Sequence, residues 1–437
     1  MKKILYLDNN NNFYLNLKLA KASKHRWMFV VFDKSKKQIL EKEKLETSCY
    51  QCNVPSYGNR NTGQLNITNH DIRSAIKNDR ILKRLPFFLA KRIALSHVNF
   101  VLDSVDIFKP DLVIGEVSWA NEYLVYKELC HRGVKYRHLL NLPLDENYIV
   151  SFDSEHSFSS LKEAEGLSGE RYGERINYYD LCEGVKKRYS KLGNIKLVTK
   201  RLFDFSSQIN DYRINQIYWK TRLVIKYIYI IFDQAFNKLC KNIDYIQSTD
   251  KKIIYFSLHI QPEATPDFVS MKFSDQLNLA SQIASRLATD EILIIKDHPN
   301  SISIRNIYKL LALYLKPNVI FIRRKASASE LINLSSLVCS VAGTVSLESI
   351  KKSKPAIVFS NIFYNQSKFI SSITEINDFV KEKEFLLSLK CVHDDLSNNI
   401  CCYGVKGFIH DPSIFPDVLL EKNINAINEL INAIIEK

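Results

Sequence analysis

The chain has 437 residues, 46% of them hydrophobic, which is long enough for two folded domains that each bury a core. Its 61 Lys and Arg residues outnumber 47 Asp and Glu residues, and the formal charge of +14 favours an anionic partner such as a nucleotide, an acidic glycan or a phospholipid surface. We do not expect nucleic acid, because the cations are scattered and no nucleic-acid recognition motif is present. No apolar run reaches the roughly 18 residues that would span a bilayer.

The N-terminal residues and the cysteines indicate the cellular compartment. The apolar run Ile4–Leu7 ends at Asp8 and is far too short for a secretory signal, so we expect a cytoplasmic protein. Cys49 and Cys52 form a CxxC motif without a second pair at zinc-ribbon spacing, and the nine cysteines do not resemble a disulfide framework. We therefore expect reduced thiols, no structural metal and no cofactor.

Strands and helices alternate in the first region of the chain. Lys3–Leu7, Trp27–Phe32 and Leu112–Gly115 have the length and composition of buried parallel strands. From about residue 158 to 250 the chain is basic and rich in Tyr and Ile, and its patterning is helical. We predict a Rossmann-like α/β domain over residues 1–157, followed by a helical connector or insertion over residues 158–250.

A second alternation of strands and helices follows the connector. Ile253–Phe256, Ile292–Ile295 and Leu337–Val341 predict three more buried strands of a parallel sheet. Close to the C-terminus, Ile and Leu residues recur on one face of a helix. We predict a second Rossmann-like domain over residues 251–410 and a C-terminal helix, over residues 411–437, that packs across both domains.

Polar clusters follow each of the three strands of the second domain. The carboxyl ends of parallel strands meet at one edge of a sheet, and open α/β sheets bind ligands at that edge. We therefore expect the clusters to form one nucleotide or phosphate site. Its candidate binding residues are His259, Gln261, Lys296, His298, Pro299, Gly343, Thr344 and Glu348.

The residue types of this edge suit a phosphate group. Gly343 and Thr344 lie between a strand and a helix, where main-chain N–H groups and a hydroxyl can hold an anion; alternatively, Gly343 only permits a tight turn. Pro299 keeps the preceding His298 extended, so that the imidazole can donate a hydrogen bond to a phosphate or leaving-group oxygen. Glu348, one turn into the helix, can reach a ribose hydroxyl or can be a solvated helix residue.

Two carboxylates are candidates for work at the reacting centre, together with His298. Glu263 follows the first strand of the second domain, where it can bind a sugar hydroxyl, face an oxocarbenium charge or act as a nucleophile. Glu116 ends a strand of the first domain, where a general base for an acceptor hydroxyl is expected on the opposite wall of a cleft. Each has a simpler explanation: Glu263 can be a surface acid, and Glu116 can be an acid at a helix N-terminus. Which carboxylate is catalytic stays open.

At these residues the chain resembles the capsule polysaccharide biosynthesis family of bacterial glycosyltransferases, over residues 250 to 365. The resemblance implies a GT-B fold with two Rossmann-like domains facing a cleft, metal-independent transfer and surface-glycan substrates. Related transferases use CMP-activated Kdo, which implies that His298 and Pro299 hold the nucleotide phosphate with Gly343 and Thr344 alongside. The matching segments are, in order, Tyr255–Thr265, Asp275–Leu277, Lys296–Pro299, Ala342–Val345, Lys354–Pro355 and Phe363–Tyr364.

From the residues and the resemblance together we expect a glycosyltransferase. It would transfer a sugar from a nucleotide-activated donor, preferably a CMP-sugar such as CMP-Kdo, to a capsule or lipopolysaccharide glycan, while UDP- and GDP-sugars stay open. One alternative is a glycerophosphotransferase that uses CDP-glycerol at the same phosphate-binding edge. Another is a non-catalytic glycan-assembly protein.

One stretch of the connector suggests contact with a membrane. Cations and aromatic residues surround the apolar run Leu223–Ile231, which is too short and too charged to span a bilayer. The segment can rest on the anionic inner-membrane surface, which would suit a lipid-linked glycan acceptor, or it can be an ordinary helix packed against the domains. The surrounding residues are Trp219, Lys220, Arg222, Lys226, Tyr227, Tyr229 and Phe232.

Overall fold

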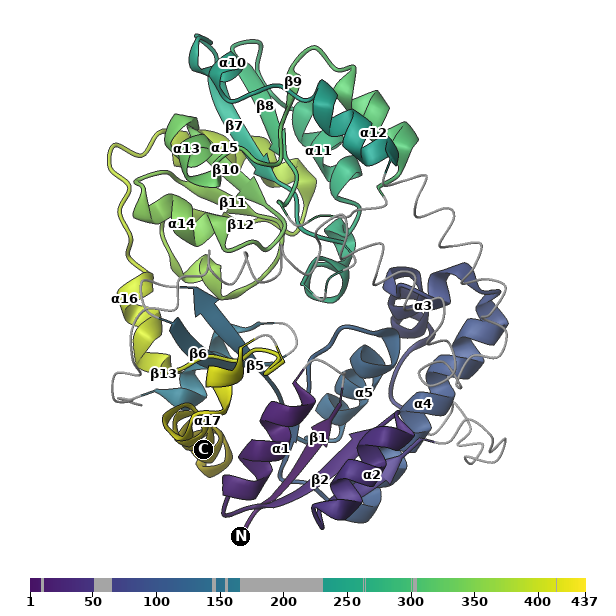
Figure 1. Cartoon of the computed structure of the whole chain (residues 1–437). Helices are drawn as coiled ribbons and strands as arrows, with labels where there is room; N and C mark the ends of the chain where they lie inside the picture. Colours follow the sequence, from purple (N-terminus) through teal and green to yellow (C-terminus); the bar gives the residue numbers. More distant parts are fainter. Residues whose placement is uncertain are drawn as a thin grey trace. The chain divides into compact units, whose positions relative to one another are not determined.

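The computed structural model divides into two compact units (Figure 1). Unit 1 comprises Met1–Ser154, Ser159–Gln216 and Ile400–Lys437, and unit 2 comprises Glu155–Phe158 and Ile217–Asn399. The structure describes residues 1–8, 12–50, 65–143, 147–153, 156–165, 231–261, 263, 265–299, 301, 305–413 and 415–437. Most of the expected helical connector, residues 166–230, lies outside the described residues.

Unit 1 is built on a seven-stranded sheet with the order β13-β6-β5-β4-β1-β2-β3. The strands from β5 to β3 are parallel to one another, while β6 and β13 are added as antiparallel strands. The parallel part has the Rossmann order 3-2-1-4-5, whose direction of winding reverses between β1 and β4. The strands are β1 Lys3–Leu7, β2 Arg26–Val31, β3 Glu46–Cys49, β4 Leu112–Ile114, β5 Tyr136–Pro143, β6 Asn147–Phe152 and β13 Gly404–Lys406.

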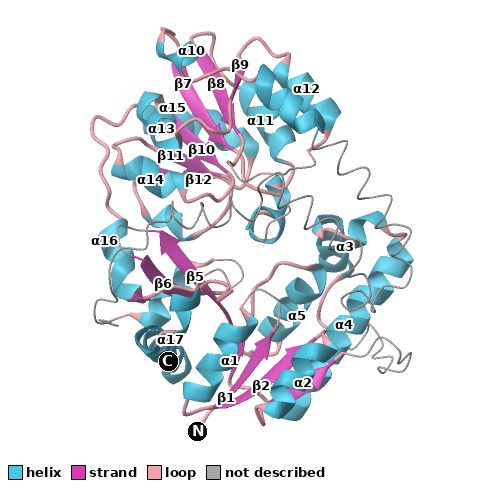
Figure 2. Ribbon diagram, viewed as in Figure 1, coloured by secondary structure: helices cyan, strands magenta, loops and turns pink. Residues whose placement is uncertain are grey.

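Helices flank this sheet, and the C-terminal helix completes its core (Figure 2). Ile424, Ile427 and Leu430 of α17 are buried with residues of α1 and β1, because their spacing places them on one helix face. The recorded contacts of α17 are with α1, β6, β13 and short neighbouring turns. The helices are α1 Phe13–Ala22, α2 Lys34–Lys42, α3 Asn69–Asn78, η2 Leu82–Arg84, α4 Phe87–Phe108, α5 Ala120–His131, α6 Phe158–Leu161, η3 Lys162–Ala164, η8 Cys401–Tyr403, η9 Pro416–Leu419 and α17 Glu421–Glu436; α16 Ser397–Ile400 spans the boundary in sequence between unit 2 and unit 1.

Unit 2 contains a six-stranded, fully parallel sheet with the order β12-β11-β10-β7-β8-β9. This is the complete Rossmann order 3-2-1-4-5-6, with its reversal between β7 and β10. The strands are β7 Lys252–Ser257, β8 Glu291–Lys296, β9 Val319–Ile322, β10 Leu337–Ser340, β11 Ala356–Val358 and β12 Ile370–Ser372. The helices are α10 Asp244–Gln247, η4 Thr265–Val269, η5 Met271–Phe273, α11 Gln276–Ala284, α12 Ile307–Tyr314, α13 Ala328–Leu334, α14 Val345–Lys351, η6 Phe363–Gln366, η7 Ile376–Asp378 and α15 Phe379–Leu387.

The predicted fold class is confirmed: the chain is α/β, with two Rossmann-like sheets and a C-terminal helix. The expected membrane segment lies outside the described residues, apart from its last two positions. Of these, Ile231 is exposed, while Phe232 stacks on Phe236 at the margin of the unit 2 core. In the part of the chain that the structure describes, no helix is long and apolar enough to cross a membrane.

Candidate functional site

His259 joins the two loops at the reversal point of the unit 2 sheet. Its Nε2 accepts a hydrogen bond of 3.1 Å from the N–H of Ala342, so the loops after β7 and β10 are tied together. Its main-chain N–H donates to Gln276 and its carbonyl accepts from Arg305, both at 2.7 Å. With Nε2 as the acceptor, a neutral His259 carries its proton on Nδ1, 3.8 Å from Glu263 Oε2. His259 therefore positions this edge, since its Nε2 is already in use.

The turn after β10 is packed closely against that imidazole. A Cβ atom on Gly343 would lie 3.3 Å from the ring of His259, which is a tight contact. The Gly343 N–H, which the sequence suggested for phosphate, already donates to Ser340 Oγ at 3.1 Å. The N–H groups of Thr344 and Val345 and the Thr344 hydroxyl have no partner among the described residues. These groups are the ones free to meet an anion.

Lys296 brings an unpaired positive charge to the same edge. It is the last residue of β8 and is only 3% exposed. Its ammonium group makes no hydrogen bond or ion pair with the described residues. Burial lowers the pKa of Lys296 to about 8, although Asp297 and Glu348 oppose that shift. A buried charge without a partner is costly, and an anionic ligand would offset this cost.

His298 follows in the same loop and is close to several charges. Burial lowers its pKa below the usual value; Glu263 raises it and Lys296 lowers it further. The imidazole is therefore neutral at pH 7 and can donate one hydrogen bond. Pro299 is exposed in the turn that is closed by the Ser301 N–H on the His298 carbonyl at 2.9 Å.

Glu348 belongs to the same electrostatic group. The residue as a whole is exposed on α14, but the loss of water around its carboxylate raises its pKa. Lys352, Lys351 and Lys296 act to lower the pKa. Its carboxylate lies close enough to Tyr255 and Tyr364 to raise their pKa values as well, after the larger effect of burial.

Gln261 has a structural role in this arrangement. Its amide nitrogen donates to Asp267 Oδ1 at 2.9 Å and to the Ser274 carbonyl at 2.7 Å. Asp267 Oδ2 also accepts from the N–H of Glu263 at 3.0 Å. These bonds fix the loop after β7 and leave the half-exposed Glu263 carboxylate at its surface.

A network of two acids and two arginines supports the loop that carries His298, and the sequence did not reveal it. Arg305 binds Asp297 at 2.7 Å, Arg324 binds it at 3.2 Å, and Arg324 also binds Asp233. Burial alone would raise the pKa of Asp297, but Arg305 and Arg324 outweigh it and hold the pKa below its usual range. Asp297 and Arg324 had a sequence signal, because they closely follow β8 and β9 at the same sheet edge.

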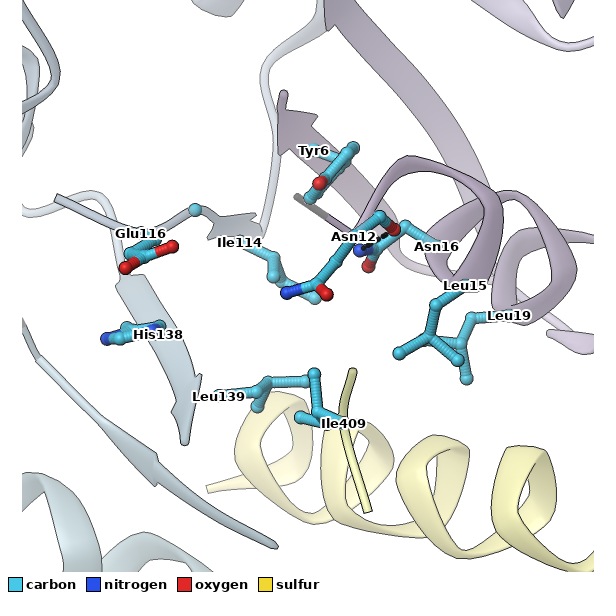
Figure 3. Close-up of a pocket in the computed structure, with 11 residues that line it drawn as sticks. Tyr6, Asn12, Leu15, Asn16, Leu19, Ile114, Glu116, His138, Leu139 and Ile409 are labelled. Carbon is cyan, nitrogen blue, oxygen red and sulfur yellow. Dashed lines mark hydrogen bonds between the residues drawn. The ribbon is translucent and has the colours of Figure 1, made fainter. Parts of the chain in front are cut away.

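The corresponding edge of unit 1 holds Glu116 in a pocket (Figure 3). Glu116 and His138 lie on one side of it, and the carboxylate acts to raise the His138 pKa, which burial nevertheless lowers. Behind this edge, the buried Glu122 accepts hydrogen bonds from the Ser118 and Trp119 N–H groups at 2.7 and 3.1 Å. Burial raises the Glu122 pKa well above its usual value, and Glu116 adds to the shift. The pocket is lined by Tyr6, Asn12, Leu15, Asn16, Leu19, Ile114, Gly115, Glu116, His138, Leu139 and Ile409.

The structure thus brings together the candidates of unit 2 at one sheet edge and places Glu116 at the matching edge of unit 1. A cleft shared by Glu116 and Glu263 depends on the arrangement of the two units and stays a prediction. Among the described residues, no group of three or more His, Cys, Asp and Glu side chains could hold a metal ion.

No protein-family model and no curated protein matches the chain. Among solved structures, the UDP-GlcNAc 2-epimerase from Neisseria meningitidis bound to UDP-GlcNAc aligns over 100% of both chains, with 11% identity and a TM-score of 0.27. The Methanocaldococcus jannaschii UDP-GlcNAc 2-epimerase aligns over 89% of this chain and 94% of its own, with 11% identity and a TM-score of 0.30. A glycosyltransferase from Rickettsia africae aligns over 100% and 96%, with 12% identity and a TM-score of 0.28. Scores this low establish no relationship, and the fold assignment rests on the strand orders of this chain.

Proposed function

We propose that the protein is a glycosyltransferase that binds a nucleotide-activated sugar at the carboxyl edge of the unit 2 sheet. The observation that carries the proposal is Lys296, a buried ammonium group without a partner among the described residues, at the edge where such sheets bind ligands. The free N–H groups of Thr344 and Val345 add donors for a phosphate. The resemblance to the capsule polysaccharide family favours a CMP-sugar, such as CMP-Kdo, and a capsule or lipopolysaccharide glycan as acceptor.

In this mechanism the donor phosphate is held by Lys296 and the turn after β10. His298, which is neutral because burial lowers its pKa, donates a hydrogen bond to the departing phosphate oxygen. Glu263 belongs to the loop after β7 and acts electrostatically on His298, which follows β8. In this mechanism Glu263 faces the sugar. The bond that breaks joins the anomeric carbon to the phosphate oxygen, and the new bond joins that carbon to the acceptor hydroxyl.

The acceptor hydroxyl must lose a proton, and the unit 1 pocket supplies the groups for this step. Glu116 is the general base that takes the proton, and His138, whose pKa is lowered by burial, lies beside it. This assignment requires that the two sheet edges face each other during transfer.

Nucleotide titration of the Lys296→Met variant tests the donor site. Loss of a charge-assisted contact should weaken the binding of CMP or CDP by about 10- to 100-fold. The same variant should unfold at a higher temperature, because removal of the buried charge stabilises the fold by about 1 to 3 kcal/mol. Lys251→Met, at an exposed position of unit 2, is the matched control and should change neither property. Equal nucleotide affinity in the wild type and in Lys296→Met would overturn the site.

The pH dependence of binding provides a second test of Lys296. Its pKa of about 8 means that the ammonium is charged below pH 8 and loses its proton as the pH rises. Nucleotide affinity should therefore fall by up to about tenfold per pH unit above pH 8, and Lys296→Met should abolish this dependence.

Product analysis then identifies the reaction: transfer of glycerol phosphate supports the CDP-glycerol alternative, and nucleotide binding without any transfer supports a glycan-assembly protein.

A further inference from the structure

A basic surface with two exposed phenylalanines lies where α3, η2 and α4 of unit 1 meet. Phe88 is 75% exposed and Phe87 is 42% exposed, both in the first turn of α4. The elements α3, η2 and α4 are in contact with one another, and Figure 1 shows α3 and α4 side by side. We call this surface the basic aromatic patch; it consists of Arg73, Arg84, Phe87, Phe88 and Arg92.

The two rings contribute little to the core of unit 1. The buried face of α4 begins at Ala90 and continues through Ala94 and Val98, whereas Phe87 and Phe88 precede it. Pro86, at the N-cap of α4, starts the helix without a side-chain hydrogen bond, so the rings stand at the open end of the helix. Two neighbouring exposed Phe side chains are unfavourable in water unless another surface covers them.

The charge around these rings is strongly one-sided. Residues 69–92, which cover α3, η2 and the start of α4, contain seven Lys and Arg residues and two acids, Asp71 and Asp79. Asp79 is 2% exposed, and its carboxylate accepts hydrogen bonds from the N–H groups of Ile81, Leu82 and Ala120. It therefore supports the local fold and adds no negative charge to the surface. The Arg73 guanidinium lies over the Phe87 ring, 5.5 Å from its centroid, which keeps cation and aromatic together.

We propose that the basic aromatic patch docks unit 1 onto an anionic phospholipid surface. Phe87 and Phe88 enter the boundary between head groups and acyl chains, and the surrounding cations bind lipid phosphates. A phenylalanine ring offers no hydrogen-bonding group to the hydroxyls of an acidic glycan, so the pair fits hydrocarbon better than such a glycan. The proposal does not depend on the sugar-transfer activity. It also uses residues different from the segment around Leu223–Ile231.

Vesicle co-sedimentation of the full chain tests this proposal. At low salt the wild type should bind vesicles that contain about 30% phosphatidylglycerol in phosphatidylcholine, and it should not bind vesicles of pure phosphatidylcholine. Phe88→Ser should weaken binding several-fold, and Arg84→Glu with Arg92→Glu should weaken it by at least about 25-fold, since each charge contributes about fivefold. Lys34→Glu with Lys42→Glu, on the exposed face of α2, makes the same change in net charge and is the matched control.

The outcomes separate the docking surface from general charge attraction. Retained binding by the α2 control, together with loss of binding by the patch variants, supports the proposal. Equal loss in both double variants means that net charge alone drives binding and overturns it. Binding to an acidic polysaccharide but not to anionic vesicles, or no vesicle binding at low salt, also overturns it. Circular dichroism of Phe88→Ser, whose side chain is exposed, verifies that the fold persists.

Discussion

The parallel parts of the two sheets share the order 3-2-1-4-5, but their carboxyl edges bury groups of opposite charge. The unit 2 edge buries the cation Lys296, whereas the unit 1 edge buries the acid Glu122 behind Glu116. In each case burial shifts the pKa toward the neutral form: downward for the lysine and upward for the glutamic acid. The Rossmann topology therefore determines where a site can lie, while the buried side chains determine whether it suits a phosphate or the activation of a hydroxyl.

The largest expected effects come from separating the roles of the two edges in catalysis. His298→Ala should lower kcat by about 100- to 1000-fold, because it removes a donor to the departing phosphate. Glu116→Gln should lower kcat by about 100-fold or more while leaving nucleotide affinity unchanged, because a general base is lost from the other unit. Steady-state kinetics with nucleotide titration measure both. Near wild-type transfer by both variants would show that neither His298 nor Glu116 takes part in catalysis.

Stability should distinguish the paired acid of unit 2 from the buried acid of unit 1. Asp297→Asn leaves Arg305 and Arg324 without their shared carboxylate and should cost about 3 to 5 kcal/mol. Glu122→Gln keeps an oxygen for the two N–H groups and should cost less than about 1 kcal/mol. Urea unfolding measures both changes, and a larger cost for Glu122→Gln would reverse this interpretation.

The pH dependence of the two acids has opposite signs. The lowered pKa of Asp297 gives stability that is present above its usual pKa and is lost as the pH falls through the folded value. The raised pKa of Glu122 makes the folded state retain a proton that the unfolded chain releases, so its contribution to stability declines as the pH rises above about 4.5. Glu122→Gln should remove this decline, and Asp297→Asn should leave it in place.

Two glycines, in the turns after β4 and β10, compare how tightly the two edges are packed. In Gly115→Ala the new Cβ would lie 2.5 Å from the hydroxyl of the buried Tyr136, and we expect a cost of about 1 to 3 kcal/mol. In Gly343→Ala the nearest atoms belong to the His259 ring at 3.3 Å, and the expected cost is at most about 1 kcal/mol. Thermal unfolding measures both, and a greater loss for Gly343→Ala would show that the unit 2 edge is the more tightly packed.

Much of the fold could be predicted from local patterns. The runs Lys3–Leu7, Ile253–Phe256 and Ile292–Ile295 predicted central strands, because strands covered on both faces are continuously apolar. The apolar face of the last helix was visible from its 3.6-residue period. The two sheets followed from the repeated alternation of strands and helices, since parallel strands need helical crossovers.

The bonding of the site could not be predicted, because its partners are distant in the sequence. His259 and Ala342 are 83 residues apart, and Asp233 and Arg324 are 91 apart. Without these contacts, the Gly343 N–H looked available for a phosphate and Gln261 looked like a ligand-binding residue.

The sequence by itself determined which residues follow the ends of the strands, and hence that His298, Lys296 and Glu116 lie at sheet edges. Period and composition are local properties, and the carboxyl ends of parallel strands share one edge. Only the tertiary structure decided which polar groups at those edges are already paired, which buried charge makes no hydrogen bond or ion pair with the described residues, and that Phe88 points to solvent. Burial and hydrogen bonding depend on elements brought together from distant parts of the chain, and the pattern of any one segment does not contain them.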